Sequence, residues 1–134
     1  MSQQQLLLII LGVIVVGVSV AVGITLFEDS SSRDANRDAV VTDLVTLATR
    51  AQQYYRRPTA LGGGQGSFEG LTLDEITSKP SNANGSYVLT DIAATKCTIT
   101  GTGVAVGNDG TNPVKVSVQV YGDSMAYMAF TVDN

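Results

Sequence analysis

The chain has 134 residues, with 12 acidic and 8 basic side chains, no histidine, no tryptophan and one cysteine. The length suits a single domain, and the net charge of −4 argues against a protein built mainly to neutralise nucleic-acid phosphate. Without histidine the chain lacks the commonest general base and zinc ligand, and one cysteine excludes an intramolecular disulfide. Every charged side chain lies at or after Glu28, so two different kinds of sequence are joined end to end.

The first segment is apolar enough to span a membrane. Residues 6–27 read LLLIILGVIVVGVSVAVGITLF, in which only Ser19 and Thr25 are polar. As an α-helix this run is about 33 Å long, and the core of a bilayer is about 30 Å thick. Because every face of the run is apolar, lipid or protein must surround it. We therefore predict an apolar stem helix over residues 1–27.

A cleaved secretory signal is the alternative for this segment. Such a signal needs a basic N-terminal region and a shorter apolar core, whereas residues 1–5 contain no Lys or Arg. Arg33 and Arg37 follow the stem, so the positive-inside rule places the C-terminal side of the chain as it stands in the cytosol. A basic leader that has been removed would reverse this assignment, and we expect that there was one.

Three glycines, at positions 12, 17 and 23, interrupt the stem. Each costs about 1 kcal/mol relative to alanine in a helix. Glycine is also common in membrane helices, where it permits close packing, and this spacing does not match a GxxxG pair. Two readings stay open. The glycines are ordinary for a membrane helix, or the stretch from Gly17 to Gly23 unwinds when the helix leaves lipid.

Residues 28–57 are predicted to form an amphipathic helix. Apolar residues recur at three- and four-residue spacing from Val40 to Tyr55, and charged residues lie mostly on the opposite face. Pro58 ends the helix. The serines at 30–32 either cap a new helix or form a solvated patch on one continuous helix.

Residues 58–134 are predicted to be a glycine-rich loop and a β head, which forms one globular domain with residues 28–57. Four strands are predicted, at 86–92, 96–106, 114–121 and 125–132, with a strong turn signal at 107–113. Short connections make neighbouring strands antiparallel. The predicted fold is α+β, with a long N-terminal helix packed on an antiparallel sheet of about four strands.

Motifs for catalysis or metal binding are weak. The run GGGQGS at 62–67 lacks the Lys-Ser/Thr ending of a phosphate loop and is interpreted as a flexible connector. Asn108-Asp109-Gly110 is interpreted as a hairpin turn and not as a calcium loop. Cys97 fits a buried small apolar residue. We expect no enzyme activity, no cofactor and no metal site.

Two surface features carry alternatives. Asn84 begins an N-glycosylation acceptor, Asn-Gly-Ser, so modification there is an option. The end of the helix places cations beside aromatic rings, a combination that single-stranded DNA can use, although helix-end and core roles explain these residues better. They are Arg50, Tyr54, Tyr55, Arg56 and Arg57.

This order of elements resembles a mature type IV pilin: an uncharged stem, an amphipathic helix ending near residue 57, a glycine-rich loop and an antiparallel sheet. In that family a prepilin peptidase removes a short basic leader, and the new first residue is N-methylated. The resemblance thus implies that Met1 is the processed and methylated residue.

The chain departs from the usual pattern at Gln5. The bacterial family has glutamate at that position, where it pairs with a neighbour's N-terminal amine. Glutamine accepts a hydrogen bond but cannot neutralise an ammonium in an apolar core, so we expect the amine to be satisfied otherwise, or a divergent or archaeal-type branch. Cys97 alone cannot form the family's C-terminal disulfide.

The resemblance implies a structural subunit of an extracellular pilus-like helical filament, anchored in the cytoplasmic (inner) membrane before assembly. Its implied partners are copies of itself, the inner-membrane assembly machinery, the prepilin peptidase and the lipid bilayer. The alternatives are a membrane-anchored extracytoplasmic binding module and a pseudopilin of a secretion system. The residues expected to make subunit contacts are Gln5, Leu6, Leu7, Leu8, Ile9, Ile10, Leu11, Val13, Ile14, Val15, Val16, Val18, Val20, Val22, Ile24, Leu26 and Phe27.

Overall fold

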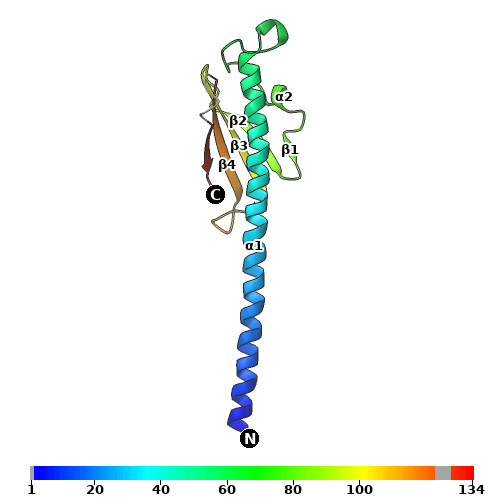
Figure 1. Cartoon of the computed structure of the whole chain (residues 1–134), viewed down its shortest axis with the longest axis vertical. Helices are drawn as coiled ribbons and strands as arrows, with labels where there is room; N and C mark the ends of the chain where they lie inside the picture. The colour runs from blue at the N-terminus through cyan, green and yellow to red at the C-terminus, as the bar shows by residue number, and fades with distance from the viewer. Residues whose placement is uncertain (1, 123–127) are drawn as a thin grey trace. The chain divides into compact units, whose positions relative to one another are not determined.

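The computed structural model describes residues 2–122 and 128–134. Helix α1 (Gln3–Arg56) is followed by a 3₁₀ turn, η1 (Thr59–Leu61), and a short helix, α2 (Leu73–Ile76). The strands are β1 (Ser81–Asn82), β2 (Gly85–Thr90), β3 (Lys96–Val106), β4 (Pro113–Tyr121) and β5 (Met128–Val132) (Figure 1). The chain forms two compact units, residues up to 32 and residues from 33 onward.

Helix α1 includes the serines at 30–32, so the reading as one continuous helix is confirmed there. The helix ends at Arg56, one residue before the predicted end, and Pro58 follows in an extended conformation. Proline lacks the amide hydrogen that a further helical turn would need.

The glycine-rich loop closes the C-terminal end of α1. The amides of Gly64, Gln65 and Gly66 donate to carbonyls of residues 54, 57 and 55 at 2.9, 3.0 and 2.7 Å. Gly62 and Gly66 have φ angles of +81° and +85°, which favour glycine. The loop is therefore a hydrogen-bonded helix cap where a flexible connector was expected. The amides that a phosphate loop would need are already bonded.

The five strands form one antiparallel meander in the order β1-β2-β3-β4-β5. Strand β3 has the predicted bounds, and β2 and β4 differ from prediction by one or two residues at their ends. For the last predicted strand, 125–132, the described part is β5, and its first three residues lie outside the described residues.

The sheet has five strands and not the four predicted, because Ser81–Asn82 pairs with Gly85–Ser86 as β1. Two residues are too few to show an alternating pattern, which is why the sequence does not reveal this strand. The apolar stretch at 71–76 forms α2, whose first turn is closed by Glu75 Oε2 accepting from the Thr72 amide at 3.2 Å.

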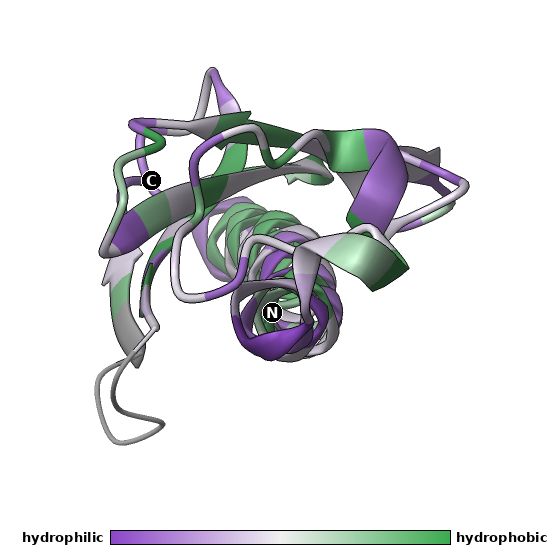
Figure 2. Ribbon diagram, turned by 90° about the horizontal axis from the view of Figure 1, so that it is seen from above, coloured by the Kyte–Doolittle hydropathy of each residue, from purple (hydrophilic) through white to green (hydrophobic). Residues whose placement is uncertain are grey.

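The core lies between the sheet and residues 33–56 of α1. Val114, Val116, Val118 and Val120 alternate inward along β4 and are 0 % exposed, as is Leu44 of α1. Figure 2 looks along the helix and shows the sheet curving over one side of it. This confirms the α+β class and places one helix face on one sheet face.

Two glycines of β3 let the helix approach the sheet closely. A Cβ atom added at Gly101 would lie 2.7 Å from Val40 Cγ1, and one added at Gly103 would lie 2.1 Å from Asn36 Oδ1. Side chains are not found at such short distances, so α1 can lie this close to β3 only because both positions are glycine.

Candidate assembly surface

The first unit presents an apolar helical surface. Each of the 16 large apolar side chains from Leu6 to Phe27 is between 47 % and 74 % exposed. These are the predicted assembly residues apart from Gln5, which is also exposed. So much exposed apolar area is unusual for a protein surface and marks a site for lipid or protein contact.

The two hydroxyls in this surface are satisfied within the helix. Ser19 Oγ donates to the Val15 carbonyl at 2.8 Å, and Thr25 Oγ1 donates to the Ala21 carbonyl at 3.1 Å. An unpaired hydroxyl in an apolar medium costs several kcal/mol. The helix can therefore enter an apolar environment without leaving these groups unpaired.

Helix α1 is long and apolar enough to cross a membrane, and its most apolar part is not buried within the chain. By length and composition this is a candidate membrane-spanning helix, and it indicates membrane association.

Gly17 and Gly23 lie inside α1, and added Cβ atoms at either would meet no atom within 4 Å. Nothing in the single chain needs glycine there, so their role, if specific, depends on neighbours outside the chain. Unwinding between them stays a prediction. At the N-terminal end, Ser2 Oγ accepts from the Gln5 amide at 3.3 Å, and the predicted methylation site, Met1, lies outside the described residues.

Asn36 fixes the helix to the sheet by polar contacts. Its Oδ1 accepts from the amides of Val104 and Ala105 at 3.0 and 3.2 Å, and its Nδ2 donates to the Asn84 carbonyl at 2.9 Å. These amides lie where the β3–β4 register shifts between Thr102 and Val106. The side chain satisfies backbone groups that the irregular ladder leaves free.

Asp43 is the second polar anchor. Its Oδ2 accepts from Asn82 Nδ2 at 3.1 Å, from Asn84 Nδ2 at 3.0 Å and from the Tyr87 hydroxyl. Burial alone would raise the pKa of Asp43, but the hydrogen bonds, that from Tyr87 first, outweigh it and hold the pKa below its usual value. Burial and the bond to Asp43 raise the pKa of Tyr87.

The glycosylation candidate, Asn84, takes part in both anchors and is half-buried. Its Nδ2, the atom that a glycan would join, donates to Asp43, and its backbone amide donates to Asn82 Oδ1 at 2.8 Å. In the folded head this side chain is a structural donor. Glycosylation at Asn84 stays a prediction.

The aromatic residues of the possible DNA site belong to the core. Tyr54 is 8 % exposed and its hydroxyl donates to the Glu69 carbonyl at 3.4 Å. The Tyr55 ring lies 4.9 Å from that of Phe68. Arg50 Nη1 donates to the Ile76 carbonyl at 2.9 Å. Tyr54 therefore belongs to the core and Tyr55 packs against it, which supports the core reading.

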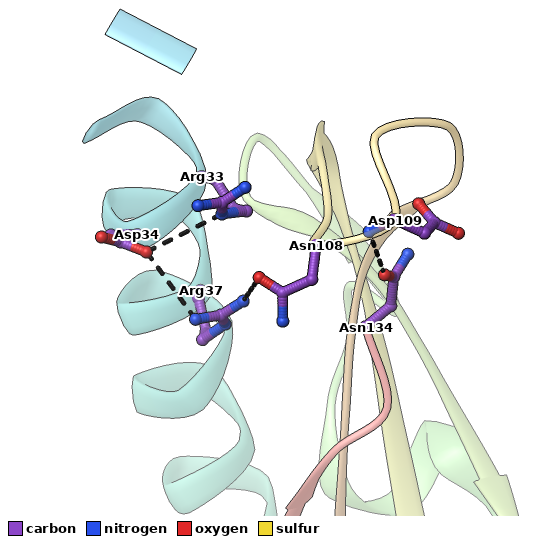
Figure 3. A network of polar contacts seen from close by, with 6 residues as sticks. All are labelled: Arg33, Asp34, Arg37, Asn108, Asp109 and Asn134. Atoms are coloured by element: carbon purple, nitrogen blue, oxygen red, sulfur yellow. Dashed lines mark hydrogen bonds and ion pairs between the residues drawn. The ribbon is translucent and has the colours of Figure 1, made fainter. Parts of the chain in front are cut away.

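The start of the head carries a small charged network (Figure 3). Asp34 Oδ1 lies 4.0 Å from Arg33 Nε and 3.7 Å from Arg37 Nη1, and Arg37 Nη2 donates to Asn108 Oδ1 at 3.0 Å. Asn108 lies in the turn between β3 and β4, and the next residue of that turn, Asp109, donates from its backbone amide to Asn134 Oδ1 at 3.0 Å.

The 107–112 segment is confirmed as a hairpin turn. The Gly110 amide donates to the Gly107 carbonyl at 3.2 Å, and Gly110 has a φ angle of +75°. Asp109 accepts from the amides of Thr111 and Asn112, which hold the pKa of Asp109 below its usual value.

Cys97 is 0 % exposed, and burial raises the pKa of its thiol to about 12. It is a core residue, as predicted. Among residues 2–122 and 128–134, no group of three or more His, Cys, Asp or Glu side chains is placed to hold a metal ion.

No family model, curated protein or solved structure matches the chain. The architecture is nevertheless pilin-like, since a long apolar N-terminal helix is followed by a helix-on-sheet head with an antiparallel C-terminal sheet. Sequence reasoning identified the apolar surface but missed the anchors at Asn36 and Asp43. Their seven-residue spacing on one helix flank, opposite the Asn-rich turn at 82–84, was the available signal.

Proposed function

We propose that this chain is a structural subunit of an extracellular, type IV pilus-like helical filament. One observation carries the proposal: a helical segment with only two polar side chains, exposed along its whole length, precedes a compact head that has a hydrophobic core of its own. Such a segment needs an apolar environment that the chain does not supply.

Two environments suit this segment in turn, the bilayer before assembly and the stems of other copies afterwards. Burying a Leu, Ile or Val side chain is worth about 1.5–3 kcal/mol relative to water, so release of the segment into water is strongly disfavoured. Between lipid and protein the difference is much smaller. Extraction from the membrane therefore requires an assembly machine, with which the chain would interact, as it would with the prepilin peptidase.

Filament growth follows from the kind of contact. Identical head-to-tail contacts that do not close into a ring generate an open helix. In this proposal the subunit is not an enzyme and takes no cofactor. The particular role of the filament, such as adhesion or motility, depends on features of the assembled surface.

Electron microscopy and mass spectrometry of sheared cell-surface material test the proposal. We expect filaments that contain this chain, with its first residue Met1 and N-methylated. Cells that express the chain but yield no such filaments would contradict the proposal. An intact leader on the mature chain would favour the membrane-anchored binding module.

A further inference from the structure

Strand β5 carries apolar side chains on its inner face that are only partly buried. Phe130 and Val132 of β5 pair with Val118 and Val116 of β4, so all four lie on the inner side of the sheet. The β4 residues are 0 % exposed, whereas Phe130 is 40 % and Val132 is 49 % exposed. The inward side chains are therefore fully buried on β4 and only partly buried on the adjacent strand β5.

The flank of α1 on this side carries two apolar residues that are not fully buried. Val45 is 41 % exposed and Val41, one turn earlier, is half-buried. The same flank leads to Gln52, whose Nε2 donates to the Tyr121 carbonyl at the end of β4 at 3.3 Å. The opposite flank carries Asp43, which is bonded to the β1–β2 turn. The Val45 flank therefore faces the β5 side.

Together these four residues, Val41, Val45, Phe130 and Val132, form what we call the β5 seam. An α-helix is about 10 Å across and neighbouring strands are about 4.8 Å apart, so one helix covers roughly two strands. On the other side of α1 the segment 68–76 supplies the cover, with Phe68, Leu71 and Ile76 buried. Within the described residues, the β5 side has no equivalent segment, so β5, a single edge strand about 4.8 Å from its neighbour, is the less covered edge of the sheet.

We propose that the β5 seam binds the apolar part of α1, residues 6–27, of a second copy of this chain. Both surfaces are apolar and exposed in the single chain: the seam residues Val45, Phe130 and Val132 are 40–49 % exposed, and the large apolar side chains of residues 6–27 are 47–74 % exposed. The incoming segment carries no side-chain charge, so its contact with the apolar side chains of the seam desolvates no charge of its own. This inference rests on the proposed filament function.

The contact also explains why assembly would continue. The seam and the apolar segment are different surfaces, so each copy uses its seam on one neighbour and offers its helix to another. Such a heterologous contact adds one copy after another and generates an open helix where its rotation does not close into a ring.

Site-specific photo-crosslinking tests which molecule, and which segment of it, contacts the β5 seam. A photoreactive amino acid replaces Phe130, or in the matched control Thr131, which is exposed on the opposite face of the same strand. In purified filaments we expect a crosslinked dimer from position 130 whose peptides join β5 to residues 6–27, and at least tenfold less from position 131. Crosslinks from position 130 to another head, to lipid or to a different protein would overturn the inference.

Charge substitution tests whether filament formation requires the β5 seam. Phe130→Lys is expected to reduce the filament yield at least tenfold while the full chain accumulates in the membrane, whereas Thr131→Lys leaves the yield unchanged. Abundant filaments from Phe130→Lys would contradict the seam but leave the proposed function intact. Absence of filaments from the unsubstituted chain would contradict the proposed function. The crosslink is read in filaments that have formed, so it decides the matter even if Phe130→Lys fails to fold.

Discussion

The Asp43 anchor allows a quantitative prediction of head stability. One carboxylate oxygen accepts three hydrogen bonds, from Asn82, Asn84 and Tyr87, and each joins α1 to the β1–β2 region. Replacing Asp43 by Asn keeps the shape but turns an acceptor-only group into one that also donates, toward three donors. Hydrogen bonds to charged groups contribute about 1.5–3 kcal/mol each, and part is kept by the remaining amide oxygen. We expect Asp43→Asn to lower the free energy of unfolding by about 2–4 kcal/mol.

The pH dependence of stability gives an independent measurement. The folded pKa of Asp43 is lowered, so its contribution is complete above the unfolded value of about 3.9 and is lost as the pH falls through the folded pKa. Urea unfolding of the full chain in mild detergent, followed from pH 7 to pH 3, should therefore show a steeper loss of stability at acid pH in the parent than in Asp43→Asn.

Asp38→Asn is the matched control, since Asp38 is on the same helix but exposed. We expect it to change the free energy of unfolding by less than about 0.5 kcal/mol. If Asp43→Asn and Asp38→Asn have equal stabilities and parallel pH profiles, the reasoning about the anchor is wrong.

Three further predictions concern single positions. Gly101→Val should lower the free energy of unfolding by at least about 2 kcal/mol, because an added Cβ would lie 2.7 Å from Val40 Cγ1; a denaturant midpoint equal to that of the parent would refute the close approach. Cys97 should react with a maleimide at pH 8 only after denaturation, since burial raises the pKa of its thiol to about 12; mass spectrometry detects the adduct, and rapid labelling of the native chain would place the thiol at the surface. Replacing Gly17 and Gly23 together by alanine should leave the isolated chain folded, because no atom lies near either position, but should impair filament assembly if the helix unwinds between them. Normal assembly with unchanged helicity would exclude unwinding as a requirement.

Much of the fold can be predicted from the sequence because its long segments have a uniform or regularly alternating pattern of apolar residues. The all-apolar run predicts the stem, and the valines of β4 alternate so regularly that the strand and its buried face follow directly. Elements of only a few residues are too short to show such a pattern. Strand β1 exists only because it pairs with β2 across a tight turn.

The sequence signal for the polar anchors, their seven-residue spacing, is weak for a different reason. Asn36 and Asp43 occupy the polar half of an amphipathic helix, where such residues usually face water. Their role depends on which loop folds back over that flank, and this is a tertiary property. The β5 seam is hidden in the same way, since alternation predicts the side on which Phe130 lies but not where cover ends.

The internal bonding of Ser19 and Thr25 has a consequence for the life cycle of the proposed subunit. Both hydroxyls have their acceptors on the preceding turn of their own helix, so moving the intact helix from one apolar neighbour to another breaks neither of these two hydrogen bonds. The hydrogen bonding of these two side chains does not depend on whether lipid or protein surrounds the helix. These two side chains therefore oppose neither insertion nor withdrawal, and in a subunit that returns to the bilayer with this helix intact they remain satisfied.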